Sequence, residues 1–164
     1  MIKQDARIKI ITISDRAFSG EREDLSGPAI KSYLEEKGWN ISSYIVIDDD
    51  KKRIMRELCY ACDDERMDLV LTTGGTGFAQ RDVTPEATLQ IADRLCPGIA
   101  EAIRAESLKI TKHAMLSRAV SVMRKQTLII NLPGSPKACR EGLDVVIDAL
   151  EHAIGIMRGE KLDK

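Results

Sequence analysis

Short runs of β-branched residues alternate with helical patterns along this chain, and this alternation limits the folds open to it. Strands are predicted at residues 7–13, 42–47, 69–72, 119–123 and 127–132, the last two joined through residues 124–126. Strands that alternate with helices favour parallel pairing with crossover helices. The pattern therefore predicts an α/β fold, a single-domain three-layer sandwich with a mostly parallel sheet and helices on both faces.

The predicted helices follow from apolar residues spaced three and four apart. They are a helix from Pro28 to Gly38, one through Ile54, Leu58 and Ala61, one through Ala87, Ile91 and Leu95 that ends at Pro97-Gly98, one over 99–110, and a long final helix with an apolar stripe from Leu143 to Met157.

Length and composition exclude several classes of protein. The 164 residues fit one domain, 1–164, that can bury a core without disulfides. With 43% apolar residues, 31% charged residues and a net charge of −1, neither disorder nor a nucleic-acid-binding surface is expected. The charged N-terminus and the lack of a long apolar run predict no signal peptide and no membrane span. We expect a cytoplasmic protein whose four cysteines are reduced.

A glycine loop directly follows the strand at 69–72. Gly74, Gly75 and Gly77 leave backbone N–H groups unhindered, and such a loop can approach phosphate oxygens closely. Asp82 lies in the same loop, before Thr84-Pro85, which is typical of a helix start. The loop lacks the lysine of a P-loop and the dinucleotide fingerprint. It predicts a phosphate site with a carboxylate available for a hard cation.

Four polar loops follow predicted strands and should meet at one edge of a parallel sheet, where ligands bind. They are 14–16, 48–50, 74–77 and 133–136. The acidic run Asp48–Asp50 is by default a solvated turn and helix cap. One of its carboxylates, together with Asp82, could instead share a Mg²⁺ ion that also binds nucleotide phosphates.

Other candidate residues have simpler interpretations. Cys59 and Cys62 resemble half of a zinc site but lie in a helical pattern without a second pair of ligands, so buried thiols are expected. His113 and His152 have no evident catalytic partner. Ser117-Arg118 fits either an anion-binding loop or an ordinary turn with a salt bridge.

Four ordered motifs, at 72–77, 81–87, 115–118 and 131–136, give this chain a resemblance to a known family. It resembles the MoaB/MogA family of molybdenum cofactor biosynthesis proteins, and within it the MogA-type molybdopterin adenylyltransferases, over nearly its whole length. The resemblance implies an enzyme, a nucleotidyltransferase that uses Mg²⁺ and ATP to convert molybdopterin into adenylyl-molybdopterin and pyrophosphate.

The resemblance also assigns residues. The two essential aspartates of the family correspond to Asp49 and Asp82, which would be catalytic and bind Mg²⁺. The implied substrate-binding residues come from the strand ends and the polar loops: Ser14, Thr73, Gly74, Gly75, Thr76, Gly77, Ser117, Pro133, Gly134 and Ser135.

The resemblance further implies a homotrimer and a transient contact with the molybdenum-inserting enzyme. The sequence itself gives one reason to expect assembly: Val145, Ala149 and Ala153 widen the apolar stripe of the final helix, which favours an interface with another chain. Three alternatives remain open: a MoaB-type pterin-binding relative, a non-catalytic scaffold, and the related domain of competence-damage-type proteins. The last normally has a paired-aspartate motif where this chain has Arg81-Asp82.

Overall fold

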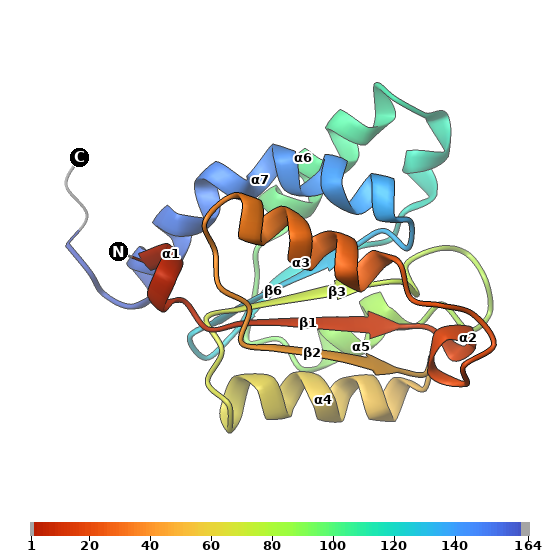
Figure 1. Ribbon diagram of the computed structural model, residues 1–164, viewed down its shortest axis with the longest axis horizontal. Helices are drawn as coiled ribbons and strands as arrows, with labels where there is room; N and C mark the ends of the chain where they lie inside the picture. Colours follow the sequence, from red (N-terminus) through yellow and green to blue (C-terminus); the bar gives the residue numbers. More distant parts are fainter. Residues whose placement is uncertain (1, 162–164) are drawn as a thin grey trace.

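The computed structural model describes residues 2–161, and within this range six strands form one sheet in the order β2-β1-β3-β6-β5-β4 (Figure 1). The strands are β1 (Ile8–Ile13), β2 (Ser43–Ile47), β3 (Leu69–Thr73), β4 (Arg94–Leu95), β5 (Ser121–Arg124) and β6 (Thr127–Leu132). Strands β2, β1, β3 and β6 pair in parallel, whereas β5 runs antiparallel to β6 and β4 antiparallel to β5. The predicted mostly parallel sheet is confirmed.

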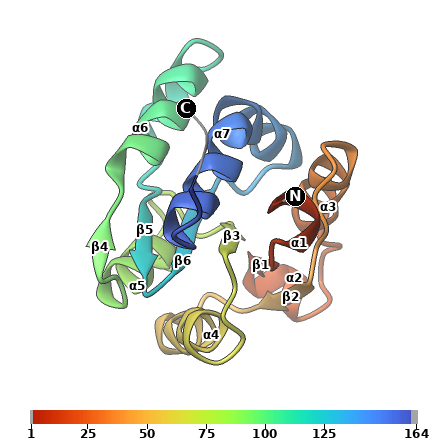
Figure 2. The same cartoon turned by 90° about the vertical axis from the view of Figure 1, so that its left-hand side faces the viewer.

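Helices cover both faces of this sheet, which gives the predicted three layers (Figure 2). They are α1 (Ile2–Asp5), α2 (Asp15–Phe18), α3 (Ser26–Glu36), α4 (Lys51–Asp63), α5 (Thr84–Gln90), α6 (Pro97–Leu108), α7 (Pro136–Met157) and the 3₁₀ helix η1 (Lys112–Leu116). One face packs against α1, α3, α6 and α7, and the other against α4 and α5. No helix within the described range could span a bilayer.

The central strands β1, β3 and β6 are buried along their whole length and mostly apolar, because both faces of the sheet are covered. Along β1, Ile8 and Ile10 belong to the core beneath α3 and α7, whereas Ile11 and Ile13 belong to the core above α4. Successive side chains of a strand point to opposite faces, so each buried strand supplies both cores. This explains why the sequence shows continuous apolar runs and not an alternation of apolar and polar residues.

The predicted helix through Ala87, Ile91 and Leu95 is wrong at its C-terminal end. Helix α5 ends at Gln90, and Leu95 lies on β4 with 65% of its surface exposed. The chain turns here because the backbone N–H of Asp93 donates to Met123, after which β4 pairs with β5. Pro97 does not break a helix but begins α6, where its missing N–H costs nothing.

Asn131 is the polar centre of the core between β6 and α5. It is 1% exposed, and its amide nitrogen donates to the hydroxyls of Thr72 (3.0 Å) and Thr88 (3.1 Å). Its amide oxygen accepts from the backbone N–H of Val120 (3.2 Å), just before β5. One side chain therefore satisfies polar groups on β3, on α5 and in the segment before β5.

We expect Asn131→Ala to lower the free energy of unfolding by about 2–3 kcal/mol, because it removes two buried hydrogen bonds to Thr72 and Thr88 and leaves the partly buried N–H of Val120 without its side-chain acceptor. Urea denaturation measures the change. Asn40→Ala is the matched control, since the side chain of Asn40 makes one exposed bond to Gln4, and it should stay within about 0.5 kcal/mol of wild type. Equal stability of both variants would contradict the role of Asn131.

Candidate active site

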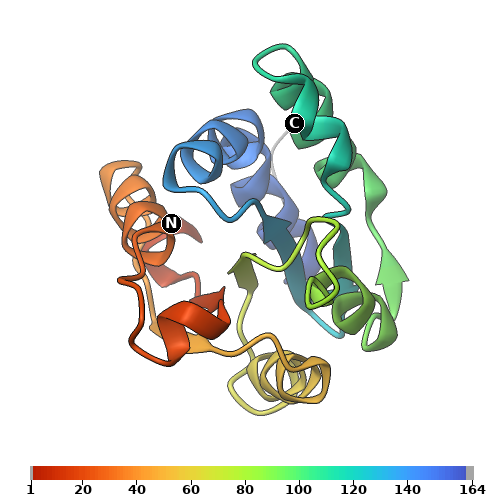
Figure 3. The same ribbon diagram turned by 90° about the vertical axis from the view of Figure 1, so that its right-hand side faces the viewer.

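The four polar loops of the predicted site meet at the carboxyl ends of the parallel strands, which face the viewer in Figure 3. The backbone N–H of Ser14, after β1, donates to Ile47 at the end of β2 (2.9 Å). At the other side, the hydroxyl of Thr73 at the end of β3 donates to the carbonyl of Pro133 (2.6 Å). In-register pairing of the strands thus brings together loops that are far apart in sequence.

The glycine loop after β3 can be built only with glycine at two positions. Gly74 and Gly75 have φ angles of 97° and 69°, in the left-handed region. A Cβ at Gly74 would overlap the carbonyl oxygen of Ile13, and one at Gly75 would overlap the hydroxyl of Thr84. That hydroxyl in turn donates to the carbonyl of Gly74 (2.9 Å), which fixes the turn.

Asp49 and Asp82 both lie close to this loop. Asp49 Oδ1 is 3.2 Å from the position of a Cβ at Gly75, and Asp82 Oδ2 is 2.9 Å from that of a Cβ at Gly77. Burial raises the pKa of Asp49, and the charges of Asp15 and Asp82 raise it further, whereas a backbone hydrogen bond from Asp15 opposes these effects. Two carboxylates that repel each other in this way favour a bound cation.

The remaining hydrogen-bonding capacity of both aspartates fits a divalent cation that a ligand helps to hold. Asp49 Oδ2 accepts a hydrogen bond from the backbone N–H of Asp15 (2.8 Å), and Asp82 Oδ2 accepts one from that of Ala79 (2.9 Å). Neither Oδ1 accepts a hydrogen bond from any residue in the described range 2–161. In that same range, no three side chains of His, Cys, Asp or Glu form a complete metal site. Mg²⁺ typically uses one or two carboxylates, water and substrate phosphates.

A polar cavity of about 220 Å³ lies on one side of the glycine loop. Seven of the predicted site residues line it: Ser14, Asp49, Thr73, Gly74, Gly75, Asp82 and Gly134. The segment 22–26 closes it from the other side. Backbone amides, hydroxyls and two carboxylates thus face one volume, which suits a phosphorylated ligand with a cation.

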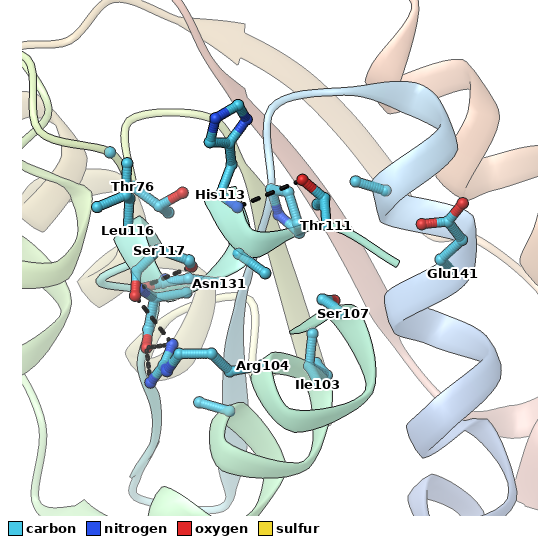
Figure 4. A pocket seen from close by; sticks show the side chains of 16 residues that line it. Thr76, Ile103, Arg104, Ser107, Thr111, His113, Leu116, Ser117, Asn131 and Glu141 are labelled. Carbon is cyan, nitrogen blue, oxygen red and sulfur yellow. Dashed lines mark hydrogen bonds between the residues drawn. The ribbon is translucent and has the colours of Figure 1, made fainter. Parts of the chain in front are cut away.

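A second, mostly apolar cavity of about 280 Å³ lies on the other side of the loop (Figure 4). Thr76, Gly77, Ser117 and Pro133 line it, together with residues of α6, η1 and α7. Its polar groups include Arg104, whose guanidinium donates to the carbonyls of Ser117 (3.1 Å) and Ala119 (3.3 Å). An apolar cavity with a few fixed polar groups is typical of a binding site for an organic ring.

The two cavities share their dividing wall. A Cβ at Gly134 would lie 3.7 Å from the Cα of Gly74, so the loop after β6 touches the loop after β3. The hydroxyl of Ser26 holds the carbonyl of Gly134 (2.6 Å), and the Cys139 thiol donates to Pro133 (3.0 Å). Burial raises the pKa of Cys139 to about 11, so this thiol stays protonated as a donor at neutral pH.

Arg118 forms a salt bridge, and it also ties the glycine loop to the segment before β5. Its guanidinium pairs with Glu86 and donates to the backbone carbonyls of Gly77 (2.8 Å) and Asp82 (2.6 Å). Of the two alternatives left by the sequence, these contacts match the turn with a salt bridge. The neighbouring Ser117 is the residue that faces the apolar cavity.

Some predicted candidates lie elsewhere. The hydroxyl of Ser135 caps α7 by accepting from Ala138 (3.1 Å), and Ser135 lines neither cavity. His152 is exposed on α7, whereas His113 lies at the rim of the apolar cavity. Cys59 and Cys62 are free thiols on α4; Cys62 is buried, as expected, whereas Cys59 is half-buried.

Sequence patterns assigned no individual role to Asp24, which lines the polar cavity, or to Asp15, whose loop was expected at the site. Asp24 accepts from the hydroxyls of Thr12 (2.7 Å) and Tyr44, and its other oxygen accepts from the backbone of Ser26 (3.1 Å) and Gly27 (3.3 Å). Burial raises the pKa of Tyr44 to about 12. A possible signal was the close spacing of Asp24 and Ser26 before a helix, which is typical of a capping turn.

Fold and site together define an α/β protein with a polar cavity at the carboxyl edge of its sheet, of a kind that suits phosphorylated ligands. The family model described as a probable molybdopterin binding domain matches residues 9–152. The chain is 42% identical to the molybdopterin adenylyltransferase of Helicobacter pylori (95% of this chain, 90% of that protein) and 47% identical to that of Escherichia coli (87% and 74%).

Among solved structures, the molybdopterin biosynthesis enzyme MoaB from Thermus thermophilus is similar, with a TM-score of 0.90 and 43% identity over 96% of this chain and 99% of that chain. The chain therefore belongs to the family of probable molybdopterin binding domains and to its MoaB/MogA group.

Gly74→Ala should lower the free energy of unfolding by at least about 2 kcal/mol, because the added methyl group meets a backbone carbonyl and the φ angle disfavours alanine. Denaturant unfolding is the measurement. Gly98→Ala provides the control, since no atom lies within 4 Å of its new Cβ, and its stability should be unchanged or up to about 1 kcal/mol higher. A Gly74→Ala variant as stable as the control would refute the steric account.

Proposed function

We propose that this chain is a molybdopterin adenylyltransferase, which uses Mg·ATP to adenylylate molybdopterin with release of pyrophosphate in molybdenum cofactor biosynthesis. The names of its relatives support this assignment. The observation that carries it is the pair of cavities on either side of one glycine loop, with Asp49 and Asp82 at the polar cavity.

The two cavities suggest where each substrate binds. The polar cavity, with the glycine backbone, Ser14 and both aspartates, suits the triphosphate of ATP. The apolar cavity beside Arg104 and Ser117 suits the flat pterin ring. The terminal phosphate of molybdopterin would then reach the α-phosphorus of ATP across the shared wall, at Gly74 and Gly134.

In the proposed reaction, an oxygen of the molybdopterin phosphate forms a bond to the α-phosphorus of ATP, and the bond from that phosphorus to the pyrophosphate oxygen breaks. Asp49 and Asp82 would hold Mg²⁺, which offsets charge on the leaving pyrophosphate. The protein acts by alignment: the glycine backbone orients phosphates, and the apolar cavity excludes water around the pterin.

Asp49→Asn and Asp82→Asn should each lower the rate of pyrophosphate release by at least about tenfold, because each removes a charge that positions Mg²⁺ and the triphosphate. The measurement is pyrophosphate release with both molybdopterin and ATP present, with binding of each substrate followed by isothermal titration calorimetry. Molybdopterin binding should change little in either variant.

Asp50→Asn is the matched control, because Asp50 belongs to the same acidic run but is exposed at the start of α4 and makes no side-chain cap bond. It should keep near-wild-type turnover. Near-wild-type turnover of the Asp49 or Asp82 variant at saturating Mg·ATP would remove that residue from the proposed mechanism.

A MoaB-type activity without adenylyl transfer is the second candidate, since the similar Thermus thermophilus structure carries the MoaB name. The same assay separates the two functions. Molybdopterin binding without pyrophosphate release would favour a pterin-binding relative or a scaffold. Retention of both aspartates beside the glycine loop supports the enzyme.

We also propose that the protein is a cytoplasmic homotrimer that contacts the molybdenum-inserting enzyme transiently. Large apolar side chains, such as Phe78, Leu95 and Ile110, are exposed and suit coverage by another chain. The final helix offers less free surface than its sequence suggests, because Val145 and Ala153 pack partly against the chain's own core. The number three comes from the family resemblance.

Sedimentation equilibrium at micromolar concentration should give three times the 18.2 kDa mass of one chain. Each active site should still lie within one chain, because its four loops come from one sheet. A monomer would rule out assembly. A dimer or hexamer would show that the trimer does not apply to this protein.

A further inference from the structure

Asp15 and Asp49 exchange hydrogen bonds across the ends of β1 and β2. The backbone N–H of Asp15 donates to Asp49 Oδ2 (2.8 Å), and the backbone N–H of Asp49 donates to Asp15 Oδ1 (3.0 Å). Each carboxylate therefore fixes the loop that carries the other. With Oδ2 held by Asp15, the second oxygen of Asp49 is presented toward the glycine loop at Gly75.

Arg81 holds Asp15 from the opposite side. Its Nε donates to Asp15 Oδ2 (2.5 Å) and its terminal nitrogen to Asp15 Oδ1 (2.9 Å), a bidentate pair with good geometry. The carboxylate of Asp49 accepts no hydrogen bond from Arg81 in the part of the chain that the structure describes. Arg81 thus orients Asp49 through Asp15, and it does so from the residue next to Asp82.

We propose that Asp15 is a positioning residue for Asp49, and that Arg81 acts by holding Asp15 in place. The inference rests on the proposed adenylyl transfer and adds residues to it. Both oxygens of Asp15 are already occupied by Arg81 and by the backbone of Asp49, so Asp15 aligns the reacting groups without binding them. Misalignment by about 1 Å can cost an enzyme about a hundredfold in rate.

Asp15→Asn tests this role, because one side-chain oxygen becomes an N–H₂ group that faces the N–H groups of Arg81. Arg81→Met keeps part of the side-chain volume and removes the clamp. Each variant should lower kcat for pyrophosphate release by about tenfold, with the KM for molybdopterin within about twofold of wild type. The double variant should lose no more than the single variants, because both changes disrupt the same contact.

The control is Arg140→Met. Arg140 lies on α7, lines neither cavity and pairs with Glu36 (2.9 Å), so its loss should leave kcat unchanged. An activity-independent readout is the ¹H–¹⁵N resonance of the Asp49 amide, which donates to a charged oxygen. This resonance should shift in the Asp15 and Arg81 variants and stay in place in the control.

The outcomes separate the two proposals. A wild-type protein that releases no pyrophosphate overturns the proposed function. An active wild type whose Asp15→Asn variant keeps its kcat overturns the positioning role alone, and so do fully additive losses in the double variant. If Asp15→Asn fails to fold, the Arg81→Met variant tests the positioning role by itself. The Arg81 side chain is 62% exposed, so this variant should fold and its kcat can be measured.

Discussion

The in-register parallel pairing of β2, β1, β3 and β6 is the constraint on which the site depends. Because of this pairing, four strands end at one edge of the sheet, and loops more than a hundred residues apart in sequence line the same cavity. The close approach of Gly74 to the carbonyl of Ile13 follows directly, because adjacent strand ends leave no room for a Cβ. A shift of one residue in the register of β3 would turn Thr73 away from Pro133 and remove this contact.

The negative charge of Asp49 at this edge of the sheet opposes folding and favours binding of a cation. The pKa of Asp49 is raised chiefly by burial, so its ionisation destabilises the folded state as the pH rises from the unfolded to the folded pKa. The pKa of Asp15 is lowered, mainly by its hydrogen bonds from Arg81, so its ionisation stabilises the fold, and that stability is lost as the pH falls. The ion pair between Arg81 and Asp15 therefore offsets part of the destabilisation that ionised Asp49 causes. A cation bound at Asp49 would reduce that destabilisation further.

Sequence patterns predicted the fold class and most long elements because the buried strands are mostly apolar and the long helices have clear apolar stripes. They failed where tertiary contacts determine local structure. Leu95 continues a helical spacing, but pairing with β5 makes it part of a strand. The short helices α2 and η1 have too few residues for a periodic signal. The roles of Asp15 and Arg118 depend on partners 32 and more residues away, which no local pattern reveals.

The loops of the site are held through their backbone carbonyl groups. The Arg118 guanidinium donates to the carbonyls of Gly77 and Asp82 in the glycine loop, and the Ser26 hydroxyl donates to the carbonyl of Gly134 in the loop after β6. These contacts use acceptors, so they orient the chain without consuming the N–H donors that phosphates need. Such preorganisation suits a reaction in which the protein supplies alignment and charge rather than a covalent step, because the groups that position the phosphates need little rearrangement when substrates arrive.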